Sequence, residues 1–109
     1  MGRTVAEVIR EITRDHLTHN HGLFLGQCVT AVGWIGGTVP EMSEEQGIVE
    51  LSLADVTNAG IAVGAALTGR RPIYTVRYQG FMWYNAAPIV NYAAKSKDVW
   101  GVPCPVFLR

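Results

Sequence analysis

A carboxylate and a group of aromatic side chains are the residues of this chain best suited to holding a flat ligand. Asp55 stands near the start of an apolar stretch of small side chains that runs to Gly64, and Tyr78 and Phe81 follow the next apolar stretch. An acid and an aromatic ring at neighbouring strand ends can hold a planar heterocycle, the acid by hydrogen bonding and the ring by stacking. The pattern therefore predicts a binding site centred on Asp55 and Phe81.

Asp55 also has a purely structural interpretation. An aspartate in front of a helix accepts a backbone N–H bond as an N-cap, which contributes about 1 kcal/mol. Gly60 and Gly64 indicate something more, because each glycine inside a helix costs about 1 kcal/mol relative to alanine. We expect a close neighbour on that helix face, with a partner helix favoured over a ligand.

The other reactive side chains form no recognisable site. The histidines from His16 to His21 end a helix, and no Cys, Asp or Glu at ligand spacing joins them, so we expect solvated polar residues and no metal site. Gly33-Trp34-Ile35-Gly36-Gly37 matches no phosphate-binding loop, and we expect an ordinary loop there. Most aromatic side chains around Trp83 and Tyr84 are expected in the core, with Phe81 facing a cleft.

Elements that could position these residues follow from the apolar periodicity. Thr4 and Glu7 have the spacing of a capping box at the start of a helix. Helices are predicted over residues 5–18, 55–67 and 84–97, and strands over 23–25, 48–51, 72–77 and 105–108. This alternation predicts an α/β fold with a mostly parallel sheet between two helical layers. Ligands in such sheets bind beyond the carboxyl ends of the strands, so Asp55 and Phe81 should share one edge.

Length, apolar content and charge limit the classes of function open to this chain. The chain has 109 residues, 49% of them hydrophobic and 17% charged, and its formal net charge is zero. We expect one domain whose apolar surface meets another chain or domain. Scattered Lys and Arg argue against nucleic-acid binding, and no apolar run approaches the ~20 residues of a membrane span. No secretory signal is recognisable, and we expect a cytoplasmic protein.

Several segments, in order, resemble the pyrimidine-binding domain of thiamine-diphosphate enzymes. The resemblance is strongest to the beta subunit of the decarboxylating component of 2-oxo acid dehydrogenases, with transketolases next. It covers residues 48–109 and, more loosely, the chain from Thr4 onward. The matching segments are Phe24-Leu25-Gly26-Gln27, Asp55 with Gly60 and Gly64, Gly69-Arg70-Arg71-Pro72-Ile73, Tyr78-Gln79-Gly80-Phe81, Ile89-Val90-Asn91-Tyr92-Ala93-Ala94-Lys95 and Pro105-Val106-Phe107-Leu108-Arg109.

The resemblance implies a thiamine-diphosphate-binding fold and chemistry carried mainly by the cofactor. It assigns Asp55 as the catalytic acid that hydrogen-bonds the aminopyrimidine and Phe81 as the residue that stacks on it. Tyr78 would form part of the wall of the cofactor site, and Gln27 would lie next to the cofactor. Two differences stand out, since the family acid is a glutamate and relatives usually carry glutamate at the position of Gln27. The segment between Gly37 and Ile48 is also shorter than in typical beta subunits.

The family's Gly-Asp-Gly element, which holds magnesium and the diphosphate together with a following Asn, is missing from this sequence. The resemblance therefore implies that a partner chain or domain supplies the diphosphate and Mg²⁺ site, in a hetero- or homo-oligomer. We expect residues 1–109 to form one pyrimidine-binding domain, either a split subunit or a piece of a longer one. Its substrate would be a small 2-oxo acid or ketose, decarboxylated or used for two-carbon or acyl transfer.

Two functions stay open at this point. One is an enzyme that works only as part of a complex. The other is a structural or regulatory subunit that keeps the fold and the interface without catalysis, which the substitutions at Asp55 and Gln27 favour. The sequence also leaves the identity of the substrate open.

Overall fold

The computed structural model describes residues 2–109, apart from the side chain of Gln79. The α-helices and β-strands are α1 (Val5–His19), β1 (Gly22–Gly26), α2 (Ala31–Gly37), β2 (Ile48–Glu50), α3 (Asp55–Leu67), β3 (Arg71–Thr75), α4 (Met82–Pro88), α5 (Ser96–Trp100) and β4 (Phe107–Leu108). Short 3₁₀ turns cover η1 (Glu44–Gln46) and η2 (Gln79–Phe81), and η3 (Ile89–Ala93) is a π-helix.

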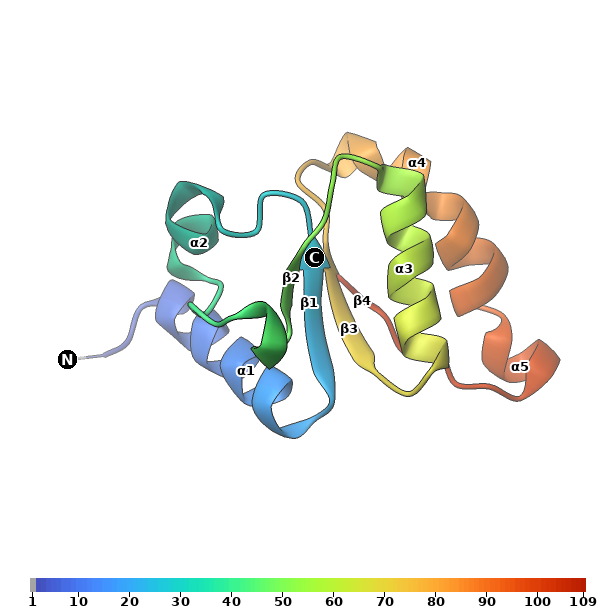
Figure 1. Ribbon diagram of the computed structural model, residues 1–109, viewed down its shortest axis with the longest axis horizontal. Helices are drawn as coiled ribbons and strands as arrows, with labels where there is room; N and C mark the ends of the chain where they lie inside the picture. Colours follow the sequence, from blue (N-terminus) through green and yellow to red (C-terminus); the bar gives the residue numbers. More distant parts are fainter. Residues whose placement is uncertain (1) are drawn as a thin grey trace.

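The four strands form one sheet in the order β2-β1-β3-β4, and each neighbouring pair is parallel. Figure 1 shows α1 and α2 on one side of this sheet and α3 and α4 on the other. The predicted three-layer α/β/α architecture with a parallel sheet is therefore confirmed. Because the chain leaves β1 toward β2 and later returns to β3 on the opposite side, the strand order switches at β1.

Alternate side chains of the strands build two separate cores. Phe24 packs with Leu17, Val39 and Ile48 on the α1 side, whereas Leu25 packs with Tyr74 and two alanines of α3 on the other side. Adjacent strand residues point to opposite faces, so one strand serves both cores. Small side chains of α3 allow that helix to lie close to the sheet.

The first and third helices form as predicted. The Thr4 hydroxyl accepts from the Glu7 N–H at 3.2 Å, and the Glu7 carboxylate accepts from the Thr4 N–H at 3.0 Å, which confirms the capping box. α3 runs from Asp55 to Leu67, the range predicted. Among residues 2–109, no helix combines the length and apolar character needed to cross a bilayer.

Residues 33–37 were expected to form a loop, and this expectation is wrong. They belong to α2, where φ is positive from Val32 through Gly37, with values of 52°, 63°, 60°, 51° and 61° at the five residues from Val32 to Gly36. This is a short left-handed helical turn. Glycine accepts such angles readily, but a side chain with a Cβ does so at a cost of about 1–2 kcal/mol per residue.

The continuous helix expected over residues 84–97 is also wrong. The chain instead forms α4, the π-turn η3 and the short helix α5, which ends at Gly101 with φ of 72°. Pro88 explains the first break, because proline has no N–H to donate to the preceding turn. A two-residue turn at 94–95 then separates η3 from α5.

Candidate functional site

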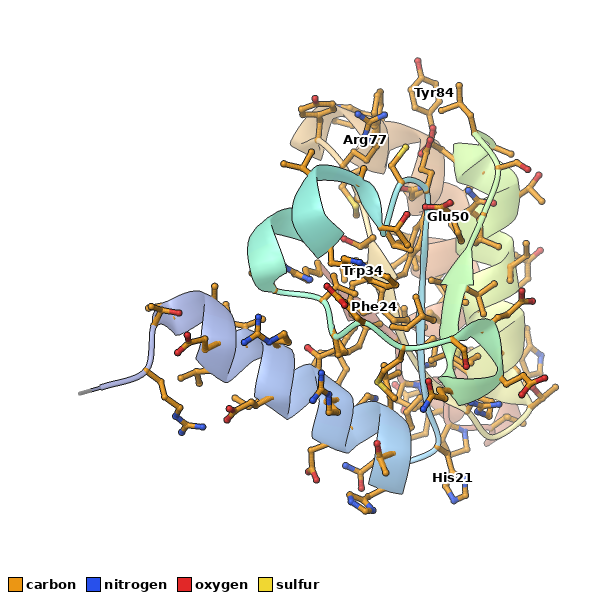
Figure 2. The ribbon with its side chains drawn as sticks, turned by 60° about the vertical axis from the view of Figure 1, so that its left-hand side comes forward. His21, Phe24, Trp34, Glu50, Arg77 and Tyr84 are labelled. Atoms are coloured by element: carbon orange, nitrogen blue, oxygen red, sulfur yellow. The ribbon has the colours of Figure 1, made fainter. Side chains whose placement is uncertain are left out.

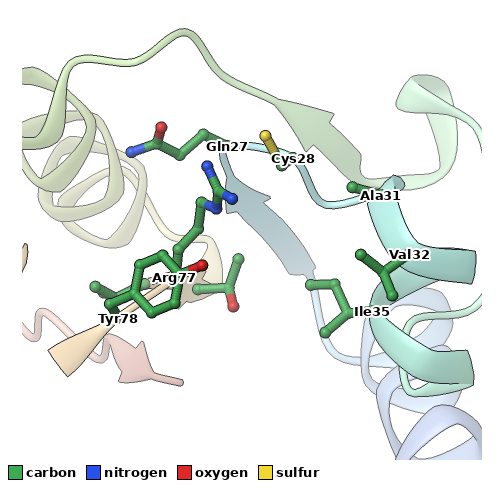
Figure 3. A pocket seen from close by; sticks show the side chains of 9 residues that line it. Gln27, Cys28, Ala31, Val32, Ile35, Arg77 and Tyr78 are labelled. Atoms are coloured by element: carbon green, nitrogen blue, oxygen red, sulfur yellow. The ribbon is translucent and has the colours of Figure 1, made fainter.

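The candidate site lies where strands β1 and β3 end side by side. A cavity of about 220 Å³ opens there. The residues that line it come from the segment after β1, from α2, and from the end of β3 and the turn after it (Figure 3): Gln27, Cys28, Ala31, Val32, Ile35, Thr75, Val76, Arg77 and Tyr78. It occupies the switch in strand order, the place where parallel sheets of this kind bind ligands.

Figure 2 places this edge relative to the rest of the molecule. Glu50, Arg77 and Tyr84 lie toward the carboxyl ends of the strands, whereas His21 lies at the opposite end of the sheet. His21 is therefore far from the cavity. His16 is less exposed than predicted, because its Nε2 lies 2.8 Å from the Arg71 carbonyl oxygen. Within residues 2–109, no group of three or more His, Cys, Asp or Glu side chains could hold a metal ion.

Gln27 and Asp55 meet at this edge. Gln27 follows β1 directly, its side chain is buried, and its Nε2 donates to Asp55 Oδ1 at 3.0 Å. Asp55 is the first residue of α3, and Ala54 occupies the N-cap position. The N-cap interpretation of Asp55 is therefore wrong, and its carboxylate is directed to Gln27 instead of to the helix N–H groups.

The turn before α3 is fixed by Asn58. This buried residue donates from Nδ2 to the Ser52 carbonyl oxygen at 2.8 Å, and its backbone N–H donates to the Ala54 carbonyl at 2.8 Å. These bonds hold the chain on both sides of the helix start. They determine where the Asp55 carboxylate stands relative to the end of β1.

Asn85 is a residue of the site that the sequence interpretation missed. It is fully buried, and its Nδ2 donates to the Asp55 carbonyl oxygen at 2.6 Å and to the Tyr74 hydroxyl at 3.1 Å. Its Oδ1 is buried and has no partner among the described residues. The signal in the sequence was an amide four residues after Phe81, inside a segment that is otherwise apolar or aromatic.

Tyr74 lies beneath these residues in the core. Burial, together with the nearby negative charge of Asp55, raises the pKa of the Tyr74 hydroxyl above its ordinary value, and the Asn85 hydrogen bond opposes this shift. The neutral phenol is therefore the favoured form, and it accepts the Asn85 amide without bringing another charge under Asp55.

The aromatic part of the site is a pair rather than a core cluster. The Tyr78 and Phe81 rings meet edge to face, with centroids 5.7 Å apart and planes at 72°. Phe81 is half-buried at the start of α4, and 63% of Tyr78 is exposed. The expected core placement of Trp83 and Tyr84 is wrong, since they are 86% and 58% exposed.

The four predicted site residues thus lie around one sheet edge, in two contacting pairs. Gln27 and Tyr78 line the cavity, whereas Asp55 reaches it through Gln27 and Phe81 contacts it through Tyr78. Asn85 ties the two halves together, because its helix begins beside Phe81 and its amide holds the Asp55 backbone. The geometry brings a carboxylate and an aromatic pair to the same place, as the sheet-edge argument predicted.

Arg77 is a second residue that the sequence interpretation left without a role. Its guanidinium carbon lies 5.5 Å from the centre of the Tyr78 ring, and it is the one charged residue among those lining the cavity. Cys28, also in the lining, is exposed and has a left-handed φ of 57°.

Comparison with known proteins gives relatives of one kind, although no family model matches the chain. The chain is 29% identical over 112 aligned positions to "Pyruvate dehydrogenase E1 component subunit beta" of Rickettsia bellii, covering 97% of this chain and 34% of the relative. It is 32% identical over 73 positions to "2-oxoisovalerate dehydrogenase subunit beta" of Bacillus subtilis, covering 63% of this chain and 22% of the relative. A similar match, 32% over 69 positions, is found to the pyruvate dehydrogenase E1 beta subunit of Mycoplasma pneumoniae, covering 60% of this chain and 20% of the relative.

These similarities confirm the resemblance to beta subunits of 2-oxo acid dehydrogenases. Where nearly the whole chain aligns, it spans about a third of the length of the relative. The similarity therefore concerns one part of such a subunit.

Proposed function

We propose that this chain provides the pyrimidine-binding half of a thiamine-diphosphate enzyme that acts on a 2-oxo acid or a ketose in the cytoplasm. A partner chain or domain would supply the diphosphate and Mg²⁺ site. The observation that carries the proposal is the meeting of the Gln27–Asp55 pair and the Tyr78–Phe81 pair around one cavity at the strand-order switch. The sequence similarity to 2-oxo acid dehydrogenase beta subunits supports it.

The residues present fit an aminopyrimidine. Asp55 Oδ1 is held by the Gln27 amide, while no hydrogen bond to Asp55 Oδ2 is found within residues 2–109, so that oxygen is free to bind a ring nitrogen. The planes of the Phe81 and Tyr78 rings meet at 72°. The face of one ring can therefore stack on a flat ligand ring, while the other aromatic ring covers the edge of that ligand ring.

Each residue then has a distinct task. Bound thiamine diphosphate would supply the electron sink that lets the bond next to a ketone carbonyl break. Asp55 would orient the pyrimidine and share a proton with its ring nitrogen. Gln27 would hold the Asp55 carboxylate in place, and Tyr78 and Phe81 would exclude water from the ring face.

Aspartate at this position needs the ring closer to α3. Asp55 is one methylene shorter than glutamate, which withdraws the carboxylate by about 1.5 Å if the backbone stays in place. The Gln27 bond supports such a placement, because it draws the carboxylate toward the end of β1 and the cavity.

The outer face of α3 is suited to a partner. A Cβ built on Gly60 or Gly64 would meet nothing within 4 Å among the described residues, so packing inside this chain does not explain either glycine. Val56 and Ile61, on the same helix, are 54% and 42% exposed. Small residues flanked by exposed apolar side chains allow another helix to approach closely, as a subunit completing the cofactor site would.

The test is binding of the aminopyrimidine half of thiamine, as its hydroxymethyl derivative, to the chain alone, measured by calorimetry. We expect saturable binding that falls at least tenfold in Asp55→Ala and in Phe81→Ala. The matched control is Asp98→Ala, an exposed aspartate on α5, which should bind as the parent does. A second titration uses thiamine diphosphate and Mg²⁺ with the product of a neighbouring gene that carries a Gly-Asp-Gly element. Absence of binding in both titrations would refute the proposal.

A structural or regulatory subunit is the second candidate. The observation that favours it is the Gln27–Asp55 bond itself, because it already satisfies one oxygen of a carboxylate that is shorter than the family's acid. In this case Asp55→Ala would lower the stability of the chain and leave the turnover of its complex unchanged. An enzyme would lose most of its turnover.

A further inference from the structure

We propose that Arg77 binds the carboxylate of a short 2-oxo acid in the cavity between the ends of β1 and β3, with Tyr78 holding the guanidinium in place. This rests on the proposed function and deepens it, because it assigns the substrate's acid group to a residue and favours a 2-oxo acid over a ketose. The structural basis is the position of Arg77 between the Gln27 side and the α2 side of the cavity (Figure 3).

Charge is the first argument. Arg77 carries the one charge in the cavity lining, and the remaining lining side chains are neutral. The ion pairs found within residues 2–109 involve Arg3 and His19, so no carboxylate of the described chain neutralises Arg77. A guanidinium without a protein counter-ion at the wall of a cavity is an attractive site for a small anion.

Orientation is the second argument. The Arg77 guanidinium carbon stands 5.5 Å from the Tyr78 ring centre, within the range of a cation–π contact. Stacking on an aromatic face restrains the plane of the guanidinium while leaving its N–H groups available at the edge. Two parallel N–H groups of arginine match the two oxygens of a carboxylate, which makes this geometry selective for that group.

The opposite wall supplies the third argument. Ala31, Val32 and Ile35 of α2 present apolar side chains to the cavity across from Arg77 (Figure 3). A cavity of about 220 Å³ is smaller than the ~300–1,000 Å³ typical of pockets for drug-sized ligands. A short acid with an aliphatic tail could bind Arg77 through its carboxylate and contact the apolar α2 wall through its tail. A ketose would place several hydroxyl groups against that apolar wall without hydrogen-bond partners.

The experiment titrates the full chain, without cofactor, with sodium pyruvate while the arginine and glutamine side-chain N–H signals are followed by NMR. Methyl pyruvate, which lacks the charge, and inorganic phosphate are titrated in parallel. We expect saturable pyruvate binding in the millimolar range, at least tenfold stronger than binding of the ester or of phosphate. The largest shift should fall on the Arg77 side chain.

Three variants make the result specific. Arg77→Gln should weaken pyruvate binding at least tenfold, and Arg77→Lys should retain part of it, because lysine keeps the charge and loses the paired N–H groups. Arg14→Gln removes an exposed arginine of α1 outside this cavity and should bind pyruvate as the parent does. Circular dichroism confirms that each variant is folded.

Unchanged pyruvate binding in Arg77→Gln would overturn the inference, as would absence of binding in the parent or equal binding of phosphate. Because no cofactor is present, the outcome is independent of the test of the proposed function. Pyruvate binding through Arg77 with no pyrimidine binding would refute the thiamine-diphosphate proposal alone. Pyrimidine binding without pyruvate binding would refute the carboxylate site alone.

Discussion

Replacement by glycine tests the left-handed turn of α2, because glycine raises stability at a residue with left-handed φ and lowers it at a residue with right-handed φ. Val32 has φ of 52° and is 87% exposed, so it carries the strain of a β-branched residue with little packing to offset it. Val32→Gly should remove about 1–2 kcal/mol of left-handed strain. Glycine's extra freedom in the unfolded chain costs about 0.5–1 kcal/mol, so the net gain should be about 0.5–1 kcal/mol.

Ala31→Gly is the matched control for Val32→Gly. Ala31 is the preceding exposed residue, and its φ is not positive. Its replacement should destabilise the chain by about 0.5–1 kcal/mol, so the two variants should differ by roughly 1–2 kcal/mol. Urea unfolding at constant slope measures both values. If Val32→Gly lowers the unfolding free energy as much as Ala31→Gly does, the left-handed assignment is refuted.

Three further predictions concern the core beneath the site. Asn85→Ala should cost about 3 kcal/mol in urea unfolding, because it leaves the Asp55 carbonyl and the Tyr74 hydroxyl buried without their donor; a loss below about 1 kcal/mol would contradict the bonding described. The pKa of Tyr74 in the folded chain is raised above its ordinary 10.0, so the unfolded chain loses this proton first, and the stability present below pH 10 should fall as the pH rises further. Tyr74→Phe should reduce this fall, and a pH profile of stability that is unchanged in Tyr74→Phe would count against the shift. Gly26→Ala should destabilise by about 1–3 kcal/mol, because a Cβ there would stand 2.9 Å from the Thr75 carbonyl oxygen of the neighbouring strand, and thermal unfolding with no decrease in midpoint would disprove this close approach.

The parts of the fold that could be predicted are those where local pattern and tertiary packing agree. The stretch around Phe24 and Leu25 is apolar on both faces because the strand serves two cores, and such continuous runs indicate a buried parallel strand. The range of α3 followed from its small apolar residues and from Gly69, where φ is 102°. Once the strands are parallel, their carboxyl ends share an edge, so the common location of Asp55 and Phe81 followed as well.

The parts that could not be predicted depend on competing or long-range effects. The three glycines of α2 accept positive φ readily, whereas Val32, Trp34 and Ile35 disfavour it. The local preferences therefore conflict, and they did not indicate a continuous left-handed turn. Pro88 was a visible signal of a helix end, and the apolar run on both sides of it concealed the break. The Gln27–Asp55 bond joins positions 28 apart, and its existence depends on strand register that no single segment specifies.

Arg77 was missed for a different reason. In the sequence it appears only as the last residue of a predicted strand, and an arginine at that position is usually a solvated end. The role proposed for Arg77 depends on its surroundings, which are the Tyr78 ring next to its guanidinium and the uncharged side chains that line the rest of the cavity. A sequence pattern lists the charges of a chain, and only the assembled sheet edge shows that Arg77 is the one charge in the cavity lining.

The Asn85 amide has a consequence for how this domain would respond to a neighbour. One 2.6 Å bond fastens the first turn of α3 to α4, while the outer side of α3, with its two glycines, is bare. A helix that docks on that bare side and shifts α3 along its axis would move the Asp55 carboxylate and, through the Asn85 bond, pull on α4. Docking of a partner would then be linked to the alignment of the acid and the aromatic ring in part through Asn85, a buried side chain outside the cavity lining.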